Sequence, residues 1–89
     1  MASYELLFKK SVARDLRDLP KRDVQRIMQW IRSLADDPRP SACEKLSGLD
    51  RYRVRQGAYR IIYEIEDARL IVFVVKAAHR REAYRASDT

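Results

Sequence analysis

The spacing of hydrophobic residues changes near the middle of the chain. Between residues 12 and 35 they recur every three to four positions, which is the spacing of one face of a helix. Pro20 divides this stretch, so we expect a short helix that begins near Ser11, with Ser11 as its N-terminal cap, and a longer helix from Lys21 to about residue 35. Pro38 and Pro40 then predict a loop, because each disfavours helix in the residue before it.

Strand patterns lie on both sides of the two helices. Residues 3–8 mix aromatic and branched side chains and predict a first strand. After the loop, hydrophobic and polar residues alternate in 52–55 and 59–65, and an apolar run follows in 70–75. The short connections between these three segments predict an antiparallel meander. We therefore expect an α+β fold of order β-α-α-β-β-β, in which a small antiparallel β-sheet carries two N-terminal helices packed on one face.

Length and composition fit one small domain over residues 1–89. The chain is 46% hydrophobic and holds only two glycines and three prolines, so a packed core is expected. One cysteine, Cys43, and one histidine, His79, exclude an intrachain disulfide and a structural zinc site, and we expect no metal and no cofactor. The chain shows neither a secretion signal nor a long apolar run, so a cytoplasmic protein without a membrane segment is expected.

Positive charge is concentrated in the second half of the chain. The net charge is +6, and residues 51–85 hold nine of the 19 Lys and Arg but only four of the 13 Asp and Glu. Alternation along a strand places Arg53 and Arg55 on one face, and the turn after Arg55 brings Arg60 close to them. Like charges on adjacent strands repel unless an anion lies between them. The pattern therefore favours a polyanion such as nucleic acid as the ligand.

A purely structural interpretation also exists for these arginines. They could be solvated or paired with acids such as Glu64, as is common on exposed sheets. Because few acids are interleaved with the set, we favour the polyanion interpretation. Glu44 is expected to be a solvated acid ahead of the sheet and outside the site. A single histidine is a weak signal of catalysis, so the value of His79 depends on its neighbours.

Three segments resemble a known family. They are Lys45–Leu49 (KLSGL), Tyr52–Ile65 (YRVRQGAYRIIYEI) and His79–Arg85 (HRREAYR). Together they resemble the RelE/ParE superfamily of toxins, on the RelE side. The resemblance implies a RelE-like fold and a ribosome-dependent endoribonuclease that cleaves mRNA in the A site. It also implies a RelB-like antitoxin protein as the partner that neutralises the toxin.

The resemblance also implies roles for individual residues. In such enzymes the ribose 2′-OH attacks the adjacent phosphorus without a metal, which requires a base, cations and an acid. The catalytic residues implied are Arg60, Arg80, Tyr84 and His79. Arg60 and Arg80 would stabilise the pentacoordinate phosphate, Tyr84 would orient or deprotonate the 2′-OH, and His79 would transfer a proton. The RNA-binding residues implied are Arg53, Arg55, Arg81 and Lys45.

Two other functions remain open from the sequence. A ParE-like toxin would have the same fold and would inhibit DNA gyrase by binding, without a cleavage site. A basic module that only binds nucleic acid or protein would need no more than the net charge.

Overall fold

In the part of the chain that the structure describes, the sheet has five strands, and the helices precede four of them. The computed structural model describes residues 3–46 and 51–79. The chain order of the elements is β1 (Glu5–Phe8), α1 (Lys10–Arg17), α2 (Lys21–Ser33), β2 (Glu44–Lys45), β3 (Arg51–Gln56), β4 (Tyr59–Glu66), the single 3-10 turn η1 (Asp67–Arg69) and β5 (Ile71–His79). The expected α+β class and the β-α-α-β-β-β order are confirmed, with the short strand β2 added.

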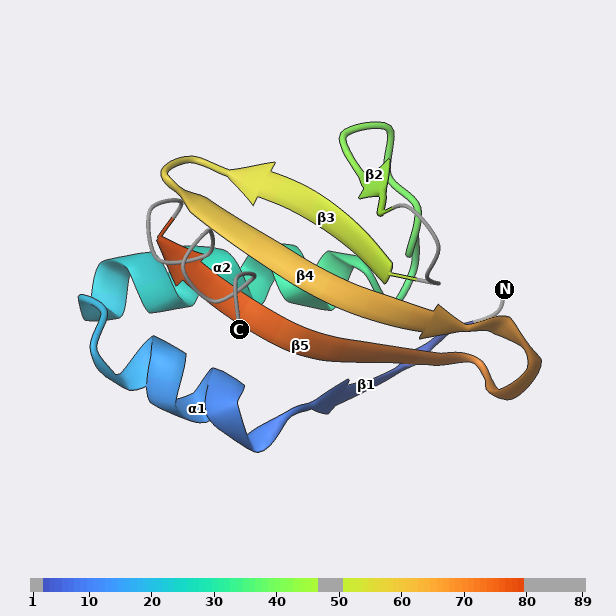
Figure 1. Ribbon diagram of the computed structural model, residues 1–89, viewed down its shortest axis with the longest axis horizontal. Helices are drawn as coiled ribbons and strands as arrows, with labels where there is room; N and C mark the ends of the chain where they lie inside the picture. Colours follow the sequence, from blue (N-terminus) through green and yellow to red (C-terminus); the bar gives the residue numbers. More distant parts are fainter. Residues whose placement is uncertain (1–2, 47–50, 80–89) are drawn as a thin grey trace.

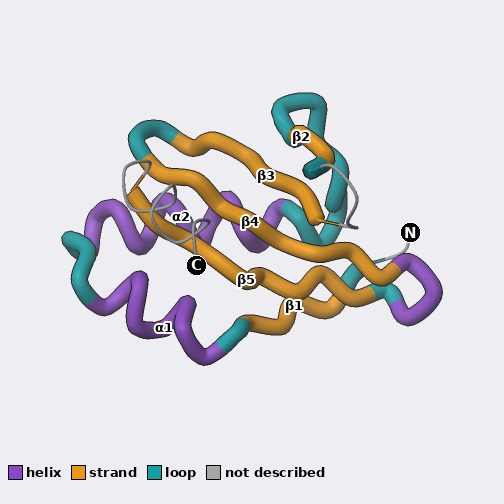
Figure 2. The backbone as a smooth tube through the Cα atoms, viewed as in Figure 1, coloured by secondary structure: helices purple, strands orange, loops and turns teal. Residues whose placement is uncertain are grey.

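The sheet is mixed, whereas an antiparallel sheet was expected. Its strand order is β1-β5-β4-β3-β2, and β3, β4 and β5 form the expected antiparallel meander. At one edge β1 runs parallel to β5, with Leu6 opposite Val72. Two helices and three strands separate β1 from β5, and a long connection of this kind lets parallel strands become neighbours. Figure 2 shows the strands as one twisted layer.

Both helices contribute to a core on one face of the sheet, as expected. Figure 1 shows α2 behind the sheet and α1 beside β5. The fully buried side chains include Val12 of α1 and Ile31 of α2, which pack in one cluster with alternate residues of β3, β4 and β5. Tyr63 is fully buried there, and its hydroxyl donates a hydrogen bond of 2.9 Å to the carbonyl oxygen of Pro38. We use the term outer face for the opposite face of the sheet, which no described helix covers.

The ends of the elements follow from local chemistry, with two departures from expectation. Lys9, and not Ser11, occupies the N-cap of α1, with no side-chain hydrogen bond. Leu70, expected as the first residue of the last strand, instead caps η1 in the left-handed conformation, with φ of 55°. Gly57 turns the chain between β3 and β4 with φ of 62°, which glycine adopts without strain. Neither helix in the described residues is long and apolar enough to cross a membrane.

Candidate functional site

Arginines of two neighbouring strands share the outer face. Arg55 of β3 lies directly opposite Arg60 of β4, and Arg53 lies two positions before Arg55 on the same strand. Directly opposed residues of an antiparallel pair point to the same side, and so do residues two apart along a strand. The intervening Val54 and the neighbouring Ile61 are buried on the helix side. The structure therefore brings Arg53, Arg55 and Arg60 together on the face that the sequence predicted.

The three arginines differ in their exposure to solvent. Arg55 is exposed, whereas Arg60 is only 7% exposed. The side chain of Arg53 is 26% exposed, and its Nε is buried without a hydrogen-bond partner among the described residues. A partly buried guanidinium acts in a lower dielectric than bulk water, so it interacts more strongly with an anion. The face thus combines solvent access at Arg55 with stronger electrostatic interaction at Arg60.

Glu44 belongs to this site, contrary to the expectation that it lies outside. The short strand β2 pairs with β3 and sets Glu44 opposite Arg53. An Arg53 Nη atom donates a hydrogen bond of 2.6 Å to a Glu44 carboxylate oxygen. This bond lowers the pKa of Glu44, and the charges of Arg53, Arg55 and Arg60 lower it further. The sequence did not reveal this contact because a two-residue strand has too few positions to show an alternating pattern.

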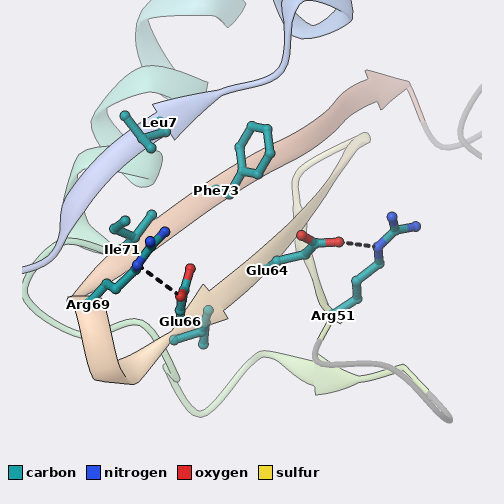
Figure 3. A pocket seen from close by; sticks show the side chains of 8 residues that line it. Leu7, Arg51, Glu64, Glu66, Arg69, Ile71 and Phe73 are labelled. Carbon is teal, nitrogen blue, oxygen red and sulfur yellow. Dashed lines mark hydrogen bonds and ion pairs between the residues drawn. The ribbon is translucent and has the colours of Figure 1, made fainter.

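Arg51 is a fourth arginine on the outer face that sequence reasoning passed over. It precedes Arg53 by two positions and lies opposite Glu64 of β4. Its Nε forms an ion pair of 2.7 Å with the Glu64 carboxylate (Figure 3). The spacing of residues 51, 53 and 55 was the signal that could have included it. Because Glu64 neutralises Arg51, this pair contributes little to the positive field.

The outer face continues from this pair into a shallow groove over β4, β5 and β1. Its volume is about 480 Å³. Leu7, Ile71 and Phe73 form its apolar side, and the ion pair between Glu66 and Arg69 closes one end (Figure 3). The outer face therefore has a basic region over β3 and β4 and an apolar region toward β1.

His79 lies on the opposite side of the sheet from the arginines. It is paired with Tyr59 in the β4–β5 ladder, and the two rings meet edge to face with centroids 5.8 Å apart. The Tyr59 hydroxyl donates a hydrogen bond of 2.7 Å to Asp23 of α2, which fixes this pair on the helix side. The resemblance groups His79 with Arg60 in catalysis, but the structure puts their side chains on opposite faces of the sheet, because residues 59 and 60 point to opposite faces.

The side chain of Lys45 also points to the helix side of the sheet. Its partner in the β2–β3 register is Tyr52, whose side chain is buried against Tyr63. Neighbouring residues of a strand alternate, so Lys45 points away from the face that carries Glu44. The structure does not bring Lys45 together with Arg53 and Arg55.

Three further residues expected in the site lie outside the described residues. They are Arg80, Arg81 and Tyr84. Within residues 3–46 and 51–79, no group of three or more His, Cys, Asp or Glu could hold a metal ion. The described part of the site is a cluster of cations with one carboxylate, which suits the binding of phosphate oxygens.

Comparison with known proteins places this fold and sequence in a toxin family. The family model described as the ParE toxin of the type II toxin-antitoxin system parDE matches residues 6–84. A protein of Methanocaldococcus jannaschii named as toxin RelE1 is 32% identical over 80 residues, which cover 85% of this chain and 89% of that protein. Toxin RelG of Mycobacterium tuberculosis is 30% identical over 87 residues, which cover 92% of this chain and 97% of the relative.

The fold of this chain also matches that of a solved structure. The structure of the toxin-antitoxin complex RelBE2 from Mycobacterium tuberculosis contains a chain that matches with a TM-score of 0.78 and 26% sequence identity. The match covers 88% of this chain and 99% of that chain. With most of its length matched by the family model and by two curated relatives, this chain belongs to the RelE/ParE superfamily of toxins of type II toxin-antitoxin systems.

Proposed function

We propose that this toxin is a ribosome-dependent endoribonuclease that cleaves mRNA in the A site. The observation that carries the proposal is the placement of Arg53, Arg55 and Arg60 on one face of the sheet. Cations concentrated on one face of adjacent strands are unfavourable for stability alone and fit a ligand with several phosphates. The RelE1 name of one relative supports the RelE side of the superfamily, for which the resemblance implies an RNA substrate and not DNA gyrase. Because mRNA on the ribosome is cytoplasmic, we place the toxin in the cytoplasm.

The proposed chemistry is transfer of the phosphoryl group within the RNA strand. The 2′ oxygen forms a bond to the adjacent phosphorus and loses its proton to a base. The bond from phosphorus to the 5′ oxygen breaks, and that oxygen takes up a proton from an acid. Negative charge builds on the phosphoryl oxygens between these events, and cations that are already oriented stabilise it.

Arg60 is proposed to act on the scissile phosphate. Its burial, with 7% of its surface exposed, makes its charge more effective than that of a fully hydrated side chain. Arg53 and Arg55 are proposed to hold the RNA backbone on either side, because they lie along the strand next to it. Arg80 is proposed to assist Arg60, and Arg81 and Lys45 to contribute more distant contacts with RNA.

Proton transfer requires residues other than these arginines. A guanidinium does not release its proton near neutral pH, so Arg53, Arg55 and Arg60 act through charge alone. We propose that Tyr84 orients or deprotonates the 2′-OH, and we retain proton transfer by His79 as a hypothesis. His79 would have to meet the RNA around the end of β5, because its ring packs on Tyr59 on the helix side. A rate of ribosomal cleavage unchanged in His79→Ala would remove it from the mechanism.

A RelB-like antitoxin is the proposed protein partner. The RelBE2 structure that this chain resembles is a complex of toxin and antitoxin. The net charge of +6 favours an acidic segment in such a partner. The reading frame next to the toxin gene is expected to encode a small acidic protein.

Inhibition of DNA gyrase is the second candidate function. The family model that matches residues 6–84 describes the ParE toxin, and this match supports gyrase inhibition as the alternative. A supercoiling assay separates the two, because the proposed nuclease leaves gyrase active. Inhibition of supercoiling without loss of mRNA would favour the ParE-like function.

The test of the nuclease uses purified ribosomes programmed with a defined mRNA. Wild-type toxin is expected to cut the message in the A site, and Arg60→Ala is expected to slow cleavage by about a hundredfold or more. Arg69→Ala is the matched control, since Arg69 is an exposed arginine 71% open to solvent, in the turn after β4. A melting curve of each variant shows whether it is folded. Cleavage by folded Arg60→Ala at the wild-type rate would refute the assignment.

A further inference from the structure

Glu44 occupies the position where a phosphate would bind Arg53. Its carboxylate lies 2.6 Å from the Arg53 guanidinium, on the strand that borders the arginines. Arg55 and Arg60 act on the same carboxylate through their charges. Carboxylates and phosphates bind guanidinium groups through the same paired oxygen geometry. A phosphodiester that binds Arg53 in this way must therefore displace Glu44 or share the guanidinium with it.

We propose that Glu44 is a built-in competitor for phosphate on the outer face, so that this face selects ligands with several phosphates over ligands with one. The inference rests on the proposed function, since it assumes that RNA binds there. A single phosphate gains one arginine contact and must displace a carboxylate. An RNA strand reaches Arg53, Arg55 and Arg60 together, and the additional contacts offset that displacement.

The position of Glu44 makes displacement feasible. Its side chain is 59% exposed, and β2 has only two residues at the edge of the sheet. Glu44 is the solvated partner of this pair, so its carboxylate regains hydration when it leaves the guanidinium, which limits the net free energy that holds it there. Without RNA, the same carboxylate reduces the repulsion among the arginines. Glu44 thus stabilises the empty face and leaves when a stronger polyanion arrives.

An alternative role for Glu44 would be that of the base that deprotonates the 2′-OH. The nearby arginines lower the pKa of Glu44, which makes it a poorer proton acceptor at neutral pH. Geometry favours the competitor role as well, because the carboxylate faces a guanidinium. The two roles predict opposite effects of removing the charge, so one variant separates them.

The test compares Glu44→Gln with Glu66→Gln, which makes the same change on the outer face near Arg69 and away from the three arginines. Binding of a labelled single-stranded oligoribonucleotide is followed by fluorescence anisotropy. Glu44→Gln is expected to bind it about threefold to tenfold more tightly than wild type, whereas Glu66→Gln changes affinity by less than about twofold. Equal gains in both variants, or no gain in Glu44→Gln, would overturn the proposal.

A second arm uses inorganic phosphate and does not depend on RNA. The NMR signal of the Arg53 Nε–H is followed as phosphate is added to wild type and to Glu44→Gln. Phosphate is expected to shift this signal at a lower concentration in the variant, and an identical titration would refute competition at Arg53. If neither wild type nor Arg60→Ala binds the oligoribonucleotide, the proposed function is refuted instead, whatever the result with phosphate.

Ribosomal cleavage completes the comparison. Glu44→Gln is expected to raise kcat/KM in proportion to its gain in RNA affinity. Loss of cleavage at full RNA affinity would overturn the competitor role and would identify Glu44 as the base.

Discussion

Replacing Arg55 by glutamine is expected to stabilise the fold while it weakens RNA binding. Arg55 faces Arg60 directly across the β3–β4 pair. Two unit charges about 8 Å apart repel by about 0.5–2 kcal/mol at dielectric constants between those of bulk water and the protein surface. Salt at physiological strength screens roughly half of this, and Glu44 offsets more. A gain of about 0.5 kcal/mol in the free energy of unfolding remains.

Denaturant titration at low and high salt measures this gain. For a domain of this size it corresponds to about 3 °C in Tm, and it should shrink as salt rises. Affinity for a single-stranded oligoribonucleotide is expected to fall by about tenfold. The slope of log K against log salt concentration should become shallower by about 0.7, the value that corresponds to the loss of one phosphate contact. Arg69→Gln is the control, because Arg69 has Glu66 as a partner and should gain no stability.

Loss of stability in Arg55→Gln, or a gain that persists unchanged at high salt, would refute the reasoning. Either result would mean that Arg55 has stabilising partners that outweigh its repulsion with Arg60. Unchanged RNA affinity in the stabilised variant would separate this residue from the proposed site.

Three further predictions concern the scaffold. Tyr63→Phe removes the buried hydrogen bond to the Pro38 carbonyl and should lower the free energy of unfolding by about 1 kcal/mol in denaturant titration; an unchanged midpoint would contradict this. Gly57→Ala should cost about 1 kcal/mol by the same assay, because φ of +62° is strained for alanine although nothing lies within 4 Å, and a neutral result would contradict it. A hydrogen bond from Arg39 lowers the pKa of Asp67 to about 2, so this pair should stabilise the protein fully above about pH 4 and lose its effect as pH falls toward about 2. In Asp67→Asn, Tm should lose this part of its acid dependence, and melting curves with the same acid profile as wild type would contradict the assignment.

The helices and the meander were predictable because each has a strong local signal. The apolar stripe of α2 and the alternation in β3 and β4 recur over several turns or residues. The parallel pairing of β1 with β5 carries no such signal. It depends on where the chain returns after two helices, which is a property of the whole fold and not of residues 5–8.

The arginine face was predictable for the same reason, whereas its surroundings were not. Alternation alone places Arg53 and Arg55 on one side, and the short turn at Gly57 sets Arg60 opposite Arg55. His79 was grouped with the arginines because it comes directly before Arg80 in the sequence. Its position at the end of β5 does not determine the face on which its side chain lies, and that face is the helix side. Glu44 was missed because its contact with Arg53 depends on the pairing of a two-residue strand.

The claim at the centre of this account is that Arg53, Arg55 and Arg60 jointly bind the RNA backbone. A crystal structure of the toxin with a short oligoribonucleotide, methylated at each 2′ oxygen to prevent cleavage, tests it most directly. We expect phosphate oxygens within hydrogen-bond distance of these three guanidinium groups and the Glu44 carboxylate displaced from Arg53. RNA bound instead to the helix side of the sheet, with no phosphate near these three arginines, would contradict the account.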